Sequence, residues 1–104
     1  MKILCEGTYK FTPDYLMRRC GYGKMVGRNT GQTSYMRMLR PGTLYPRFHA
    51  YVEVVDGGIQ VNLHLDQRQP SYQGTSAHGG EYEGEAVERE ANRIFIFFQS
   101  YKLG

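Results

Sequence analysis

Three residues near the middle of the chain have side chains suited to acid–base chemistry or to metal binding. His49 lies in a segment that alternates polar and apolar residues, and His64 and Asp66 lie in a second segment of the same kind. Two imidazoles and a carboxylate can bind a transition metal, and paired histidines can act as general acid and base on a phosphodiester. His49, His64 and Asp66 are therefore candidate catalytic residues, and His49, His64 and His78 are candidate ligands for a divalent transition metal.

The two alternating segments predict the strands of a β-hairpin. Polar and apolar residues alternate with a period of two, as in strands that bury one face, and Asp56-Gly57-Gly58 between them is a strong turn signal. We expect antiparallel strands near 47–55 and 59–67. The residues expected to be buried on the apolar face are Val52, Val54, Val61, Leu63 and Leu65.

The position of the turn decides which residues face each other. If the two-residue loop is Asp56-Gly57, His49 lies opposite His64, and if it is Gly57-Gly58, His49 lies opposite Asp66. Such a shift keeps every side chain on its face, and directly opposed Cβ atoms are roughly 5 Å apart. The three candidate catalytic residues are therefore neighbours in either register.

A long polar loop over 68–84 leaves from the same end of the hairpin. Loops of this length are often functional or disordered, and His78 in this one could fold over the cluster. The alternative is that His49 and His64 belong to the outer face of an antiparallel sheet, which is normally polar and solvated.

Charge is divided unevenly along the chain. Residues 1–50 contain nine Lys or Arg and two acidic residues, whereas residues 51–104 contain four and eight. A basic half can attract phosphate backbones, and its tyrosines could stack on bases. We expect an interface for nucleic acid, with RNA favoured and DNA left open, at Arg18, Arg19, Lys24, Arg28, Arg37 and Arg40. The alternatives are that the two halves attract each other or that the basic side chains face solvent.

The residues before the hairpin predict one helix and one further strand. Thr12-Pro13-Asp14 is a good helix start and Gly21 a good stop, which predicts a helix over roughly 13–20. The Gly-rich, basic segment over 21–31 is interpreted as a connector or hairpin, with a phosphate cradle as the alternative. Alternation predicts a strand over 33–40.

The end of the chain predicts a helix over 85–102 that carries one apolar stripe. The stripe consists of Val87, Ala91, Ile94, Phe98 and Tyr101. Ile96 points away from this stripe and Phe97 lies at its margin. Either the chain breaks into a strand near 93–99, or a second subunit covers both residues. We expect a homodimer, because exposed apolar patches usually mark contacts.

Together these segments predict a single α+β domain over 1–104, in the order helix, three strands, helix. The expected sheet is antiparallel, with the C-terminal helix on one face. No apolar run is long enough to span a bilayer, and no apolar segment follows Lys2 as in a secretory signal. We expect a cytoplasmic protein in which Cys5 and Cys20 are reduced thiols. A nucleic-acid-binding module, a metal- or His-dependent phosphodiesterase and a structural or protein-interaction subunit all stay open.

Three strings carry a resemblance to known sequences: Tyr45-Pro46-Arg47-Phe48-His49-Ala50-Tyr51, Asn62-Leu63-His64-Leu65-Asp66-Gln67 and Ala77-His78-Gly79-Gly80-Glu81-Tyr82. They resemble a pattern in small uncharacterised bacterial proteins, over about residues 15–94. This resemblance implies no activity and no site residue.

The expected order of elements is similar to that of double-stranded RNA-binding domains and of HicA-type mRNA interferases, which is a similarity of topology alone. Two features depart from those families. The start of the final helix is acidic here, and no histidine lies in the first expected strand, near Thr33-Ser34-Tyr35-Met36.

Overall fold

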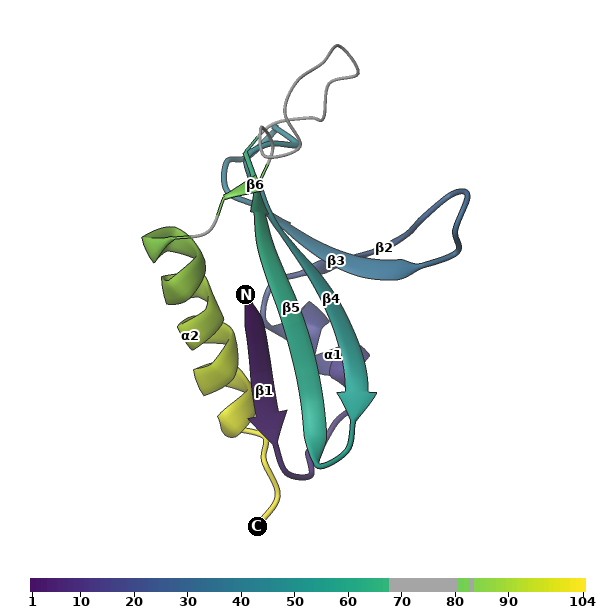
Figure 1. The fold of residues 1–104 in the computed structure, drawn as a ribbon, viewed down its shortest axis with the longest axis vertical. Helices are drawn as coiled ribbons and strands as arrows, with labels where there is room; N and C mark the ends of the chain where they lie inside the picture. Colours follow the sequence, from purple (N-terminus) through teal and green to yellow (C-terminus); the bar gives the residue numbers. More distant parts are fainter. Residues whose placement is uncertain (68–80, 83) are drawn as a thin grey trace.

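The computed structural model describes residues 1–67, 81, 82 and 84–104 and places two helices on one face of an antiparallel sheet (Figure 1). In chain order the elements are β1 (Lys2–Glu6), α1 (Pro13–Arg19), β2 (Gly23–Val26), β3 (Thr33–Met38), β4 (Arg47–Val55), β5 (Gly58–Asp66), β6 (Glu81–Tyr82) and α2 (Glu85–Gln99). The strands lie in the order β1-β5-β4-β3-β2, and β6 also pairs with β5. Among the described residues, no helix is long and apolar enough to cross a membrane.

The β4–β5 hairpin confirms the two predicted strands and decides between the two registers. Val55 pairs with Gly58, so the two-residue loop is Asp56-Gly57, and His49 lies directly opposite His64. Gly57 has a φ of +82°, which glycine adopts without the steric cost that a Cβ would add.

The apolar face of this hairpin is buried as predicted for Val61, Leu63 and Leu65. Val52 is only half-buried, and Val54 is 73% exposed, so the prediction is wrong for Val54. The reason is the extent of the neighbouring strand. Among the described residues, β3 pairs with β4 only from Arg47 to Ala50. The part of β4 nearest the hairpin turn therefore extends beyond the end of β3.

The α+β class is confirmed, but the predicted order of helix, three strands and helix is wrong. A strand, β1, precedes α1, and further strands, β2 and β6, pair with β3 and β5. The Gly-rich segment therefore forms part of a hairpin. The similarity to double-stranded RNA-binding domains and HicA-type interferases rested on the predicted order and loses its basis.

Strand β1 adds to the edge of the hairpin because a glycine lets it approach. Cys5 pairs with Ile59 and Glu6 with Gly58. A Cβ at Gly58 would collide with the backbone oxygen of Cys5. The close approach of β1 to β5 at this position is possible because glycine has no side chain.

Helix α1 begins and ends where its capping residues predict. The side-chain oxygen of Thr12 accepts a hydrogen bond from the backbone N–H of Tyr15, at 3.2 Å, which satisfies one of the unpaired donors of the first turn. Leu16, Met17 and Cys20 are buried against the sheet.

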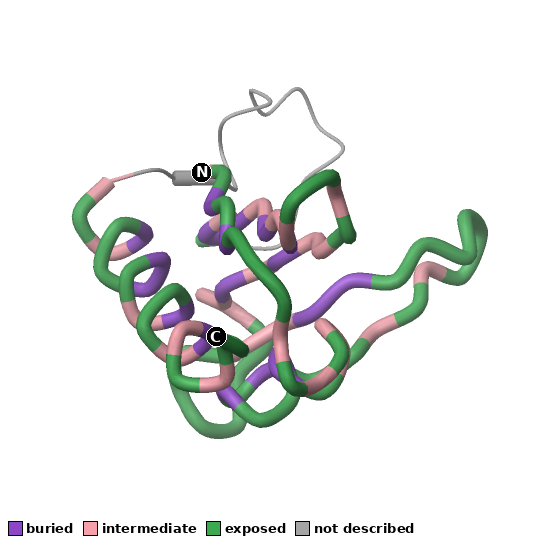
Figure 2. The backbone as a smooth tube through the Cα atoms, turned by 90° about the horizontal axis from the view of Figure 1, so that it is seen from below, coloured by how far each residue is buried: buried purple, intermediate pink, exposed green. Residues whose placement is uncertain are grey.

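Helix α2 is continuous to Gln99, so the alternative of a strand near 93–99 is wrong. Its buried positions face the sheet (Figure 2), and they include four members of the predicted stripe: Val87, Ala91, Ile94 and Phe98. Ile96 lies on the outer side and is 60% exposed.

Cys5 and Cys20 are free and buried thiols. Burial raises the pKa of each thiol to about 11. Because the thiolate is the nucleophile, both cysteines should be inert in the folded chain.

We predict that iodoacetamide at pH 8 leaves both cysteines of the folded chain unmodified over a period in which the unfolded chain is fully alkylated. The reason is that both burial and a raised pKa suppress the thiolate. Mass spectrometry of samples quenched in parallel, with and without guanidinium, measures this. Equal labelling in both samples would show that the core is not closed over these residues.

We also predict a homodimer by light scattering at micromolar concentration, because Ile96 and its neighbour Phe95 leave apolar surface on α2. Ile96→Glu should shift the mass to that of a monomer. Leu44→Glu, which alters an equally exposed apolar residue outside this helix, should leave the mass unchanged. A monomer mass for the unaltered chain would contradict the prediction.

Candidate functional site

The predicted histidine cluster lies on the open face of the sheet, which carries neither helix. His49 alternates along β4 with Phe48 and Ala50, which are buried against the helices. Its side chain therefore points to the opposite face. His64 lies directly opposite His49 on β5, so the structure brings these two predicted residues together.

Asp66 joins His49 through a hydrogen-bonded contact. The Nδ1 atom of His49 lies 3.3 Å from Oδ2 of Asp66, and the Nε atom of Arg47 donates to the same oxygen, also at 3.3 Å. Burial acts to raise the pKa of Asp66, but the hydrogen bonds from His49 and Arg47 outweigh it and lower the pKa below its ordinary value. Asp66 is therefore a carboxylate at neutral pH.

This contact determines the state of the His49 ring. A carboxylate can only accept, so Nδ1 carries the proton and donates it. The other nitrogen, Nε2, is buried and has no hydrogen-bond partner among the residues that the structure describes. A buried polar atom of this kind is uncommon, and its lone pair could be donated to a metal ion.

Tyr51 completes the aromatic part of the cluster. Its ring centroid lies 4.9 Å from that of His49 and 6.4 Å from that of His64. His78, the third predicted metal ligand, lies outside the described residues. Among those residues, no group of three or more His, Cys, Asp or Glu could hold a metal ion. The predicted metal site with His78 stays a prediction.

The predicted nucleic-acid-binding residues are only partly brought together. Arg18 and Arg19 lie on the last turn of α1. Arg18 Nη1 and Lys24 Nζ are each 3.6 Å from a carboxylate oxygen of Asp14, so both cations lie at the same carboxylate.

Arg37 of β3 lies next to the C-terminal end of α1. Its Nε atom is 3.5 Å from the position that a Cβ on Gly21 would take. In contrast, Arg28 and Arg40 lie in the loops at opposite ends of β3, so the structure does not gather them into this group.

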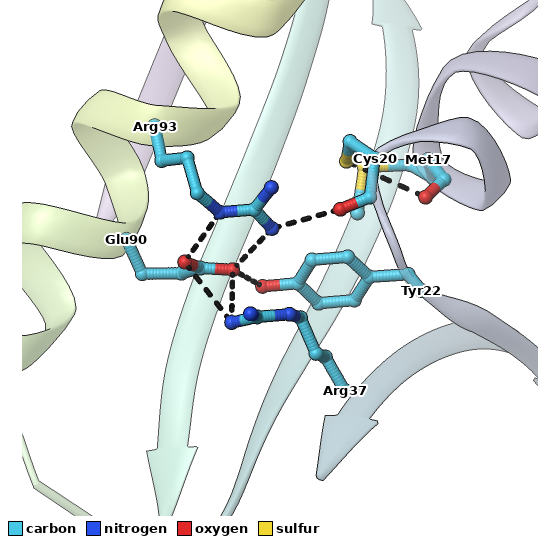
Figure 3. Close-up of polar contacts among 6 residues, drawn as sticks. All are labelled: Met17, Cys20, Tyr22, Arg37, Glu90 and Arg93. Atoms are coloured by element: carbon cyan, nitrogen blue, oxygen red, sulfur yellow. Dashed lines mark hydrogen bonds and ion pairs between the residues drawn. The ribbon is translucent and has the colours of Figure 1, made fainter. Parts of the chain in front are cut away.

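A buried carboxylate, Glu90 of α2, lies between the guanidinium groups of Arg37 and Arg93 (Figure 3). Glu90 is 5% exposed and accepts hydrogen bonds from Arg93 Nε and Nη2, both at 2.8 Å, and from the Tyr22 hydroxyl at 2.6 Å. Arg37 Nη1 lies 3.4 Å from the same carboxylate. Arg93 Nη2 also donates to the backbone oxygen of Cys20 at 2.8 Å, which ties α2 to the end of α1.

Electrostatics in this network keep Glu90 charged and Tyr22 neutral. Burial acts to raise the pKa of Glu90, but the hydrogen bonds from Arg93 and Tyr22 and the charges of Arg93 and Arg37 outweigh it and lower the pKa. Burial, together with the hydrogen bond to Glu90, raises the pKa of Tyr22 far above its ordinary value. Glu90 is thus ionised and Tyr22 neutral at physiological pH.

We name the assembled cations the α1 basic cluster: Arg18, Arg19, Lys24, Arg37 and Arg93. Two carboxylates lie among them: Asp14 pairs with Arg18 and Lys24, and Glu90 pairs with Arg37 and Arg93. Sequence reasoning missed Arg93, Glu90 and Tyr22. One signal was present, since Glu90 lies three residues after Val87 and four before Ile94, on the apolar stripe.

The basic cluster and the histidine cluster occupy opposite faces of the sheet. Arg37 pairs with the buried Phe48, whereas Met36 pairs with His49. Because directly opposed residues share a face and neighbours along a strand do not, Arg37 is on the helix side and His49 on the open side. The two predicted functions therefore correspond to two separate surfaces.

We predict that Glu90→Gln lowers the free energy of unfolding at pH 7 by about 2–4 kcal/mol, because it leaves buried donors without their anionic partner. The loss should shrink as the pH falls. The pKa of Glu90 is lowered by folding, so its contribution is fully present above the ordinary glutamate pKa of about 4.3. That contribution disappears as the pH falls through the lowered pKa.

Urea unfolding at several pH values measures both effects. Glu88→Gln is the matched control, because Glu88 is exposed on the same helix and should change the stability by no more than about 0.5 kcal/mol. An equal effect of the two substitutions at pH 7 would refute the role assigned to Glu90.

Comparisons with protein families, with characterised proteins and with solved structures find no match for this chain. Function must therefore be inferred from the arrangement of its own residues.

Proposed function

We propose that this protein is a nucleic-acid-binding module, and that its α1 basic cluster contacts the phosphates of RNA. One observation carries this proposal: cations of α1, β2, β3 and α2 gather along α1, with Lys24 beside Asp14 of its first turn and with Arg37 and Arg93 beside its C-terminal end. Five cations against two carboxylates leave a local excess of positive charge, which attracts phosphate and releases counterions on binding.

The cluster is held in place yet open to a ligand. Glu90 positions Arg37 and Arg93, and Asp14 positions Arg18 and Lys24. Even so, the side chain of Arg18 is 61% exposed and that of Lys24 is 45% exposed. Guanidinium groups with free donors can bind phosphate oxygens in a bidentate manner, so positioned arginines suit this role.

An exposed aromatic ring next to the cluster supports a single-stranded ligand. Tyr15 of α1 is 39% exposed, and the guanidinium carbon of Arg19 lies 5.8 Å from its ring centroid. Unpaired bases stack on aromatic side chains, whereas bases within a duplex do not offer their faces. We therefore favour single-stranded RNA over duplex DNA, and a homodimer would present two such clusters.

The histidine cluster is not part of this proposal, because it lies on the other face of the sheet. The metal- or His-dependent phosphodiesterase inferred from the sequence stays a prediction. A purely structural subunit would leave the excess of positive charge at α1 without a role.

We predict that a fluorescent single-stranded RNA binds the chain at low salt and that binding weakens steeply between about 50 mM and 200 mM salt. The variant Arg18→Ala with Arg19→Ala should lower the slope of log affinity against log salt by about 2, since each lost phosphate contact removes about one unit. Fluorescence anisotropy across a salt series measures both quantities.

The matched control is Lys10→Ala with Lys102→Ala, which removes the same charge from two exposed residues outside the α1 basic cluster. This pair should leave the slope nearly unchanged. If no nucleic acid binds at low salt, or if both double variants reduce the slope equally, the cluster is not a phosphate-binding surface.

A further inference from the structure

One row of the open face holds three side chains with metal-binding atoms. Met36 of β3 pairs with His49 of β4, and His49 pairs with His64 of β5. Directly opposed residues share a face and have Cβ atoms roughly 5 Å apart. Met36, His49 and His64 therefore occupy neighbouring positions on one face of three adjacent strands.

His49 is already arranged as a metal ligand. Metal-bound histidines almost always donate their second ring nitrogen to a carboxylate or a carbonyl, which fixes the ring and its tautomer. Here Asp66 accepts from Nδ1 of His49 at 3.3 Å and is itself held by Arg47. The lone pair of Nε2 remains, in a buried position where no group of the described part of the chain satisfies it.

From this row we infer a binding site for a soft transition-metal ion, of the class of Cu(I), with His49, His64 and Met36 as ligands. Thioethers and imidazoles select soft ions, whereas carboxylate and carbonyl oxygens select hard ones. Asp66 is engaged by the other nitrogen of His49, so it orients the ligand instead of supplying a hard donor.

The surroundings suit such an ion. Met36 and His64 are half-buried, and the ring of Tyr51 lies against His49, at a centroid distance of 4.9 Å. A partly apolar shell limits the access of water to the ion. Because this row lies opposite the α1 basic cluster, the metal site is independent of nucleic-acid binding.

The decisive experiment titrates the full, reduced chain with Ag(I), a redox-inert substitute for Cu(I), and then with Cu(I) without oxygen. Nitrogen-15 NMR follows the imidazoles, and carbon-13 NMR follows the methionine methyl groups. We expect one ion per chain, with shifts at Nε2 of His49, at the ring of His64 and at the methyl of Met36. The methyl of Met38 should not shift, because Met38 pairs with Arg47 in the next row.

Matched variants test the thioether. Met36→Leu should weaken the binding of Ag(I) by roughly tenfold or more, because even the loss of an outer-shell partner typically costs a metal site about that much and Met36 is a direct ligand. Met38→Leu, on the same strand and face, should leave the affinity unchanged. Both changes conserve volume, and thermal unfolding will confirm that each variant is folded.

Thiols are the competing ligands for these ions. If the shifts move to Cys5 and Cys20 and leave His49 and Met36 unmoved, the site does not exist. Equal affinity in the unaltered chain and in Met36→Leu would likewise overturn the assignment. Loss of nucleic-acid binding would not affect this result, since the two readouts concern opposite faces.

Discussion

The β4–β5 pairing is the constraint on which the rest of the structure depends. With Asp56-Gly57 as the loop, the pairing assigns every residue of both strands to one face. The apolar set forms the floor beneath α1 and α2, and the polar set, including His49 and His64, forms the open face. Strand β1 joins β5 on one side, and at its end a Cβ on Gly58 would collide with the backbone of Cys5. Strand β3 joins β4 on the other side, where its own alternation places Arg37 with the core and Met36 with the histidines.

Glu90 links the packing of α2 to the surface charge. A buried carboxylate costs free energy unless it is well paired, and this one is satisfied by Arg93, Tyr22 and Arg37. The same pairing anchors two arginines beside the end of α1. An interaction that fixes the helix against the sheet thus also orders part of the α1 basic cluster, so stability and the proposed binding surface share one group.

Sequence reasoning succeeded where a local pattern was strong. Alternation gave the hairpin, and Thr12 gave the start of α1. It failed for β1, in which only Ile3 and Cys5 alternate with exposed residues over five positions, too few to establish a period. Val54 fits the apolar pattern, but its exposure depends on where β3 ends. Contacts between distant segments, such as that of Arg93 with Cys20, leave no local signal.

The central claim is that nucleic acid binds the helix side of the sheet, along α1. The most direct test is NMR shift mapping of the labelled chain with a short single-stranded RNA at low salt. The account predicts that the largest changes fall on Arg18, Arg19 and Lys24 and on the guanidinium groups of Arg37 and Arg93. Changes confined to His49, Tyr51 and His64 on the open face, with α1 unmoved, would contradict it.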